Sequence, residues 1–88
     1  LLDEFVKNLA GLADTLVEAL RRGDHSAIAS LSHQLKGTGG MYGFPAITEA
    51  AAALETAVKS GTDLEAVARL VADLAALCRR VEVAQPSP

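Results

Sequence analysis

Apolar residues recur at spacings of three and four along most of the chain, which is the pattern of helices with one buried face. The first such segment contains Leu2, Phe5, Val6, Leu9, Leu12, Ala13, Leu16, Val17 and Leu20. It predicts a helix of about 20 residues that ends at Arg21-Arg22-Gly23. Arginines stabilise the negative end of a helix dipole, and glycine suits the position just beyond it.

Start and stop signals delimit a second and a third helix. Asp24 is placed to cap the second helix, which runs to about Tyr42. Gly43-Phe44-Pro45 then interrupts the chain, and proline is favoured in the first turn of a new helix. Tyr42 and Phe44 are expected to pack in the core. The third helix ends at Ser60-Gly61, and its apolar stripe consists of Ile47, Ala50, Ala51, Leu54 and Val58.

A fourth helix is predicted after Thr62-Asp63-Leu64-Glu65, which has the T-x-x-E pattern of a capping box. Its apolar stripe consists of Leu64, Val67, Val71, Leu74, Cys78 and Val81. Residues 84–88 are expected to form a polar tail that contains proline.

Neither strand-like alternation nor an internal repeat is visible in the sequence. Helices joined by very short connections lie antiparallel to their neighbours. The predicted fold is therefore all-α: an antiparallel up-down-up-down four-helix bundle formed by residues 1–83 as one domain.

Composition narrows the classes of function. The 88 residues are 50% hydrophobic and carry a net charge of −3, which gives no support for binding nucleic acid or an anionic membrane. No apolar run reaches the roughly 18 residues of a membrane-spanning helix. The single cysteine, Cys78, excludes an internal disulfide and favours a reducing compartment. Its place on an apolar stripe predicts a buried thiol.

The segment HQLKGTGGMYG, residues 33–43, is unusual for a helix because it holds four of the seven glycines. On a helical wheel at roughly 100° per residue, with Ile28 at zero, the core face centres at about 330° and His33 falls at about 140°. His33 is therefore predicted to face solvent. Gly39 falls at about 20°, on the core face, and Gly43 is expected to end the helix.

Small residues surround His33 on the outward face, apart from Lys36 one turn away. They are Ser26, Ala29, Ser30, Gly37 and Gly40. Glycine inside a helix costs about 1 kcal/mol relative to alanine. Exposed Gly37 and Gly40 therefore suggest that the backbone of another protein comes close to His33.

An exposed imidazole is mostly neutral at pH 7 and offers a ring nitrogen as a nucleophile. Lys36 adds a cation, which suits phosphoryl transfer, a reaction that depends on positioning and charge neutralisation. A metal site is disfavoured because the other histidine, His25, lies about 12 Å away along the helix axis. Hydrolysis by Ser26 or Ser30 lacks an evident oxyanion hole, and no nucleotide-binding signature is present.

The stretch from His33 to Phe44, HQLKGTGGMYGF, resembles the signature of histidine-containing phosphotransfer (HPt) domains. That signature reads His-x-hydrophobic-Lys-Gly, then small residues, glycine and a hydrophobic residue. The resemblance continues in Phe44-Pro45 and Ala53-Leu54-Glu55, and with the apolar first helix and Gly23-Asp24 it covers most of the chain.

The resemblance implies a four-helix bundle in which His33 is phosphorylated and Lys36 stabilises the phosphoryl group. Gly37 and Gly40 match the small residues against which a response-regulator receiver domain docks. The other residues expected on this docking surface are Ser26, Ala29, Ser30 and Gln34.

The resemblance also implies the partners of the domain. A receiver domain of a response regulator or of a hybrid histidine kinase supplies the aspartate and Mg²⁺, and the HPt domain supplies the imidazole without a cofactor of its own. The domain is then a phosphoryl carrier rather than an enzyme. It is expected to be a cytoplasmic monomer.

Glu55 is a further candidate. In the related phosphoacceptor domain of chemotaxis kinases, a carboxylate at the matching place in the third helix hydrogen-bonds the other nitrogen of the active histidine. His33 lies ten residues before Gly43 and Glu55 twelve after it, so both reach similar heights in an antiparallel hairpin. Such a contact would fix the imidazole tautomer. An ordinary solvated glutamate remains the alternative.

Two other functions stay open. The phosphoacceptor domain of a chemotaxis-type histidine kinase shares the histidine chemistry but belongs to a different parent protein. A helical interaction module that no longer transfers phosphate would be indicated by loss of the histidine or the lysine, and His33 and Lys36 are both present.

Overall fold

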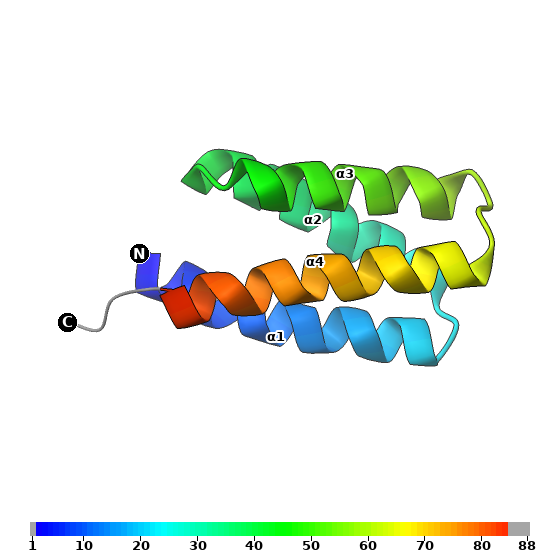
Figure 1. Cartoon of the computed structure of the whole chain (residues 1–88), viewed down its shortest axis with the longest axis horizontal. Coiled ribbons are helices and arrows are strands. Elements are labelled where there is room, and N and C mark those ends of the chain that lie inside the picture. Colours follow the sequence, from blue (N-terminus) through cyan, green and yellow to red (C-terminus); the bar gives the residue numbers. More distant parts are fainter. Residues whose placement is uncertain (1, 85–88) are drawn as a thin grey trace.

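Four α-helices make up the described part of the chain, which in this computed structural model is residues 2–84, with side chains from Lys7 to Val81. They are α1 (Leu2–Arg21), α2 (His25–Tyr42), α3 (Pro45–Lys59) and α4 (Leu64–Ala84). Successive helices run in opposite directions, and the start of α1 and the end of α4 lie at the same end of the bundle (Figure 1). The predicted all-α up-down-up-down bundle is confirmed.

The helices pack as two close pairs, α2 with α3 and α1 with α4, and contacts between α1 and α2 and between α3 and α4 complete the bundle. The largest fully buried side chains come from all four helices: Leu9, Leu16, Ile28, Leu35, Ile47, Leu54, Val67, Val71 and Leu74. Their three-and-four spacing accounts for the fold, because each helix can bury its apolar stripe only against the others.

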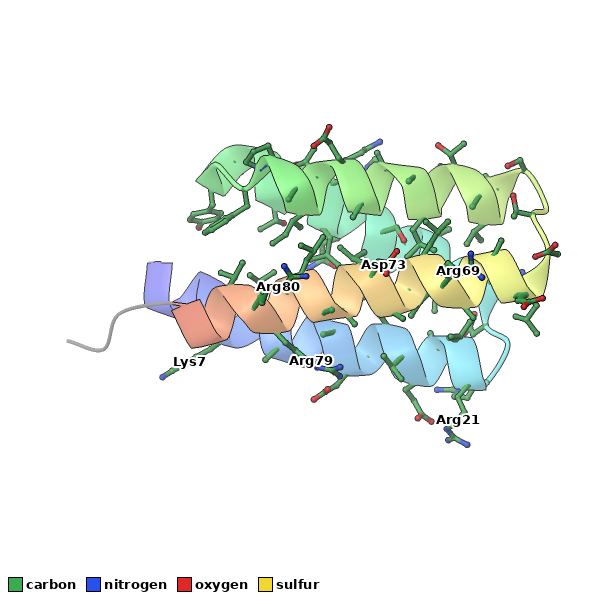
Figure 2. All side chains as sticks on the ribbon, viewed as in Figure 1. Lys7, Arg21, Arg69, Asp73, Arg79 and Arg80 are labelled. Carbon is green, nitrogen blue, oxygen red and sulfur yellow. The ribbon has the colours of Figure 1, made fainter. Side chains whose placement is uncertain are left out.

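One surface ion pair joins α4 to α1. The Arg79 Nη2 atom lies 2.8 Å from Asp14 Oδ1, and Arg79 lies beside α1 in Figure 2. Both side chains are at least half exposed. A pair in water contributes roughly 0–1 kcal/mol, so apolar packing dominates this contact.

The predicted helix ends at the first two turns match the structure. Asp24 caps α2 by accepting a hydrogen bond from the Ala27 N–H at 3.0 Å. Gly43 follows α2 with φ of 77°, in the left-handed region where glycine is favoured. The Phe44 N–H then donates to the Gly39 carbonyl at 2.8 Å, the hydrogen bond of a Schellman motif.

The predicted capping box at α4 is wrong in its details. Asp63, not Thr62, caps the helix: its Oδ1 accepts from the Ala66 N–H at 2.8 Å, and its carbonyl accepts the first helical bond, from Val67. The turn before α4 is one residue longer than the pattern implied. Leu64, expected in the core, is 60% exposed because it begins α4 beyond the neighbouring helices.

Tyr42 also departs from the prediction, because it is 39% exposed instead of buried. The buried residues of α2 are Ile28, Ser32, Leu35 and Gly39. They centre at about 10° on the wheel, which is about 40° from the predicted direction. This rotation moves Tyr42 to the edge of the core. Phe44 is partly buried against the core, and Cys78 is fully buried, as predicted.

Burial raises the pKa of the Cys78 thiol to about 11. Among the described residues, no helix is both long and apolar enough to cross a membrane. The helix α4 includes Ala84, the first residue of the predicted tail, and residues 85–88 lie outside the described part. The predicted core positions Leu2, Phe5 and Val6 have side chains outside it as well.

Candidate functional site

His33 lies near the middle of α2 and projects away from the helix's buried residues. Its side chain is 70% exposed. Ser32 and Leu35, on the other side of α2, are fully buried and anchor the helix, and the Ser32 hydroxyl donates to the Ile28 carbonyl at 2.6 Å. The imidazole is therefore held on a fixed helix while remaining open to solvent.

Glu55, from α3, lies directly beside this imidazole. Its Oε2 atom is 3.0 Å from His33 Nδ1, and its side chain is only 7% exposed. The two residues are 22 positions apart and meet because α2 and α3 pack antiparallel on either side of the Gly43 turn. Of the two readings that the sequence left open, the structure therefore shows a buried carboxylate in contact with His33.

Two lysines hold the Glu55 carboxylate from opposite ends. Lys36 Nζ donates to Oε1 at 2.8 Å, and Lys59 Nζ donates to Oε2 at 2.9 Å. These hydrogen bonds lower the pKa of the Glu55 carboxyl to about 2, against burial, which raises it. The carboxylate is therefore charged at neutral pH. Two ammonium groups around one carboxylate leave a net charge of about +1 beside the imidazole.

Lys59 is a site residue that the sequence analysis missed. It lies four residues after Glu55 on α3, the spacing at which oppositely charged side chains meet on a helix. Once Glu55 is placed against His33, that spacing predicts that Lys59 contacts the Glu55 carboxylate. Lys36, by contrast, reaches Glu55 across the α2–α3 interface, and no local pattern marks that contact.

The hydrogen bond between His33 and the accepting Glu55 carboxylate determines which ring nitrogen of a neutral His33 is free. An ionised carboxylate only accepts hydrogen bonds, so the proton of a neutral imidazole must lie on Nδ1. The lone pair then lies on Nε2, the nitrogen farther from Glu55. In that tautomer Nε2, unlike Nδ1, has a lone pair with which it could act as a nucleophile.

A shallow, open hollow surrounds the imidazole. It is lined by Ser26, Ala29, Ser30, His33, Glu55 and Lys59. Three residues expected on a docking surface therefore share a hollow with the histidine. The other three, Gln34, Gly37 and Gly40, lie on α2 outside that lining.

The glycines of α2 differ in what surrounds them. A Cβ on Gly39 would lie 2.7 Å from Thr48 Oγ1 and 3.1 Å from the Thr48 backbone nitrogen, so α2 and α3 can approach this closely only with glycine there. A Cβ on Gly37 would meet nothing within 4 Å, and one on Gly40 only Thr48 Oγ1 at 3.8 Å. Internal packing thus requires Gly39 but neither Gly37 nor Gly40.

Thr48, which the sequence analysis did not single out, reinforces the same contact. Its hydroxyl donates to the Lys36 carbonyl at 3.3 Å and so ties α3 to the backbone of the site. The crossing of α2 and α3 therefore positions both the imidazole and the carboxylate that binds it.

An outward imidazole on a helical bundle, with a buried carboxylate behind it and cations beside it, defines a group carrier rather than an enclosed catalytic pocket. Comparison with protein families bears this out. The family model of the Hpt domain matches residues 1–84, and the chain belongs to that family. Hpt domains carry out histidine phosphotransfer in phosphorelays, as phosphoryl carriers and not as kinases. Searches of curated proteins and of solved structures found no match.

Proposed function

We propose that Nε2 of His33 is the atom that carries the phosphoryl group, and that it exchanges this group with an aspartate of receiver domains. The contact between Glu55 Oε2 and His33 Nδ1 is the observation that carries the proposal, because it leaves Nε2 unprotonated and exposed. His25 is also exposed, at the first turn of α2, but it does not line the hollow.

In the proposed step, the Nε2 lone pair attacks the phosphorus of a receiver acyl phosphate. The N–P bond forms as the acyl O–P bond breaks, and the aspartate leaves as a carboxylate with the bonding electron pair. The proton on Nδ1 stays in place, and the positive charge that develops on the ring is stabilised by the Glu55 carboxylate 3.0 Å away. The reverse reaction returns the group to an aspartate.

Lys36 is proposed to stabilise the phosphoryl group. Its ammonium lies one turn from His33 and uses one of its three hydrogens for Glu55 Oε1, so the others can reach oxygens on Nε2. A cation placed beside the transferring group offsets its negative charge. Glu55 is proposed to orient the ring rather than to react.

The docking surface for the receiver is proposed to consist of Ser26, Ala29, Ser30, Gln34, Gly37 and Gly40. The open space around Gly37 supports this, because a helical glycine without a packing constraint costs about 1 kcal/mol and stabilises nothing inside the domain. Replacing Gly37 with leucine should slow transfer while the fold survives. Gly11→Leu is the matched control, since Gly11 is an exposed helical glycine on α1 with equally open surroundings.

We propose that Mg²⁺ arrives with the receiver domain, where it neutralises charge on the transferring phosphoryl group. Both Glu55 oxygens already accept hydrogen bonds from lysines, so this carboxylate is not arranged as a metal ligand. Among the side chains that the structure describes, Lys7 to Val81, no group of three His, Cys, Asp or Glu residues could hold a metal ion. The domain is further proposed to act as a cytoplasmic monomer, testable by its mass in solution.

The direct test is labelling by a phosphorylated receiver domain. The wild-type domain should gain an acid-labile phosphate, His33→Gln should gain none, and His25→Gln should be labelled like the wild type. Equal labelling of wild type and His33→Gln would refute the assignment. A wild-type domain that binds receivers but never gains phosphate would instead be a helical interaction module.

Nitrogen NMR tests the role of Glu55 separately. In the wild type, the ¹⁵N shifts of His33 should show a protonated Nδ1 and an unprotonated Nε2 at neutral to alkaline pH. Glu55→Ala should give the mixture of tautomers of a free imidazole and a slower transfer rate. An unchanged tautomer in Glu55→Ala would show that Glu55 does not orient the ring.

A further inference from the structure

Met41 is the most exposed of the large hydrophobic side chains in the described part of the chain, at 79%. A single exposed apolar side chain is ordinary in a soluble domain. Its position relative to His33 is what makes Met41 informative.

Met41 lies on α2, eight residues after His33, or about 12 Å along the helix axis. The buried residues of α2 centre at about 10° on the wheel, so the outward direction is at about 190°. His33 falls about 50° to one side of that direction and Met41 about 30° to the other. Both side chains therefore project from the same outward face.

Between them, the centre of this outward face carries no side chain, because the residue there is a glycine. Gly37 falls at about 180° on the wheel, almost at the outward direction. It has nothing within 4 Å of where a Cβ would lie. Gly40 also lacks a side chain beside Met41. The 79% exposed Met41 side chain is therefore accessible to a partner that approaches His33 over this face.

We propose that Met41 is an apolar anchor that enters a hydrophobic recess of the docking receiver domain. This inference rests on the proposed function of His33. A standard interface buries about 800 Å² on each partner, equivalent to a disc of roughly 16 Å radius. An interface of that size centred on His33 would reach Met41, about 12 Å away along the helix axis.

The chemistry of methionine fits this role. Its unbranched, flexible and polarisable side chain adapts to recesses of different shape, as promiscuous binding surfaces require. The cations at Lys36 and Lys59 attract the acidic site of a receiver, and this attraction weakens with salt. An apolar anchor adds contact energy that salt does not screen. Tyr42 lies on the other side of α2, at about 320° on the wheel, and belongs to the edge of the core.

The test compares Met41→Gln, which keeps the length of the side chain but makes it polar, with Met41→Leu, which keeps it apolar. Leu64→Gln is the matched control, because Leu64 is 60% exposed at the start of α4, at the opposite end of the bundle from the α2–α3 turn. The phosphoryl donor is a receiver domain from the organism that produces this protein. The receiver chosen is the one that labels the wild type fastest. Labelling by phosphoramidate, a small donor that needs no docking, is measured in parallel.

Met41→Gln should raise KM for the receiver about tenfold, with little change in kcat, at low and at high salt alike. The KM values of Met41→Leu and Leu64→Gln for the receiver should stay within about twofold of the wild type. Phosphoramidate should label all variants equally. A KM for Met41→Gln within twofold of the wild type, or an equal rise for Leu64→Gln, would overturn the proposal. Failure of both donors to label His33 in the wild type would instead overturn the proposed function, and this inference with it.

Discussion

Alanine at Gly39 and alanine at Gly37 should change stability in opposite directions, although the two glycines are only two residues apart on α2. In an open helical position, replacing glycine by alanine stabilises by about 1 kcal/mol. A Cβ added at Gly37 would meet nothing within 4 Å, so Gly37→Ala should gain that full amount.

At Gly39 the same change meets Thr48. The new Cβ would lie 2.7 Å from the hydroxyl, 3.1 Å from the Thr48 backbone nitrogen and 3.2 Å from Ile47 Cγ2. A backbone atom cannot rotate away, so α3 must move by some tenths of an ångström. Overpacking of this kind costs about 1–3 kcal/mol. After subtracting the gain in helix propensity, we expect Gly39→Ala to lose up to about 2 kcal/mol.

The assay is urea unfolding followed by circular dichroism, together with thermal melts. At about 4–8 °C per kcal/mol for a domain of this size, Gly37→Ala should melt roughly 4–8 °C above the wild type and Gly39→Ala up to roughly 16 °C below it. Because α3 also carries Glu55, Gly39→Ala should disturb the His33 tautomer, and Gly37→Ala should not. A Gly39→Ala domain stabilised as much as Gly37→Ala would refute the argument that α2 and α3 need glycine at their crossing.

Three further predictions concern other residues. Because the Glu55 pKa is lowered from about 4.5 to about 2, the stability that the ionised Glu55 contributes should be complete above pH 4.5 and lost as the pH falls through 2. A ¹³C titration of the carboxyl group and unfolding at each pH measure the midpoint, and a midpoint near 4.5 would contradict the prediction. Asp63→Ala should lower the free energy of unfolding in urea by about 1 kcal/mol and Thr62→Ala by clearly less, whereas the reverse order would show that Thr62 caps α4. The Cys78 thiol, buried and with a pKa raised to about 11, should react with a thiol reagent only after unfolding; rapid reaction of the native domain would show an accessible thiol.

The sequence alone determined the elements of this protein and the direction of its key side chain, because both depend on local patterns. Helical periodicity and end signals such as Asp24 and Gly43 act within a few residues, so they placed the helices and the first two turns correctly. The same periodicity placed His33 opposite Leu35, and the structure has one exposed and the other buried.

Only the tertiary structure decided how the site is assembled. The contacts of Glu55 with His33 and Lys36 cross from α3 to α2, and their existence depends on the rotation and height at which the two helices pack. That packing distance depends in turn on Gly39 meeting Thr48. The same rotation of α2 moved Tyr42 to the edge of the core. A wheel gives the direction of a side chain to within some tens of degrees, whereas a hydrogen bond requires its partner within a few tenths of an ångström.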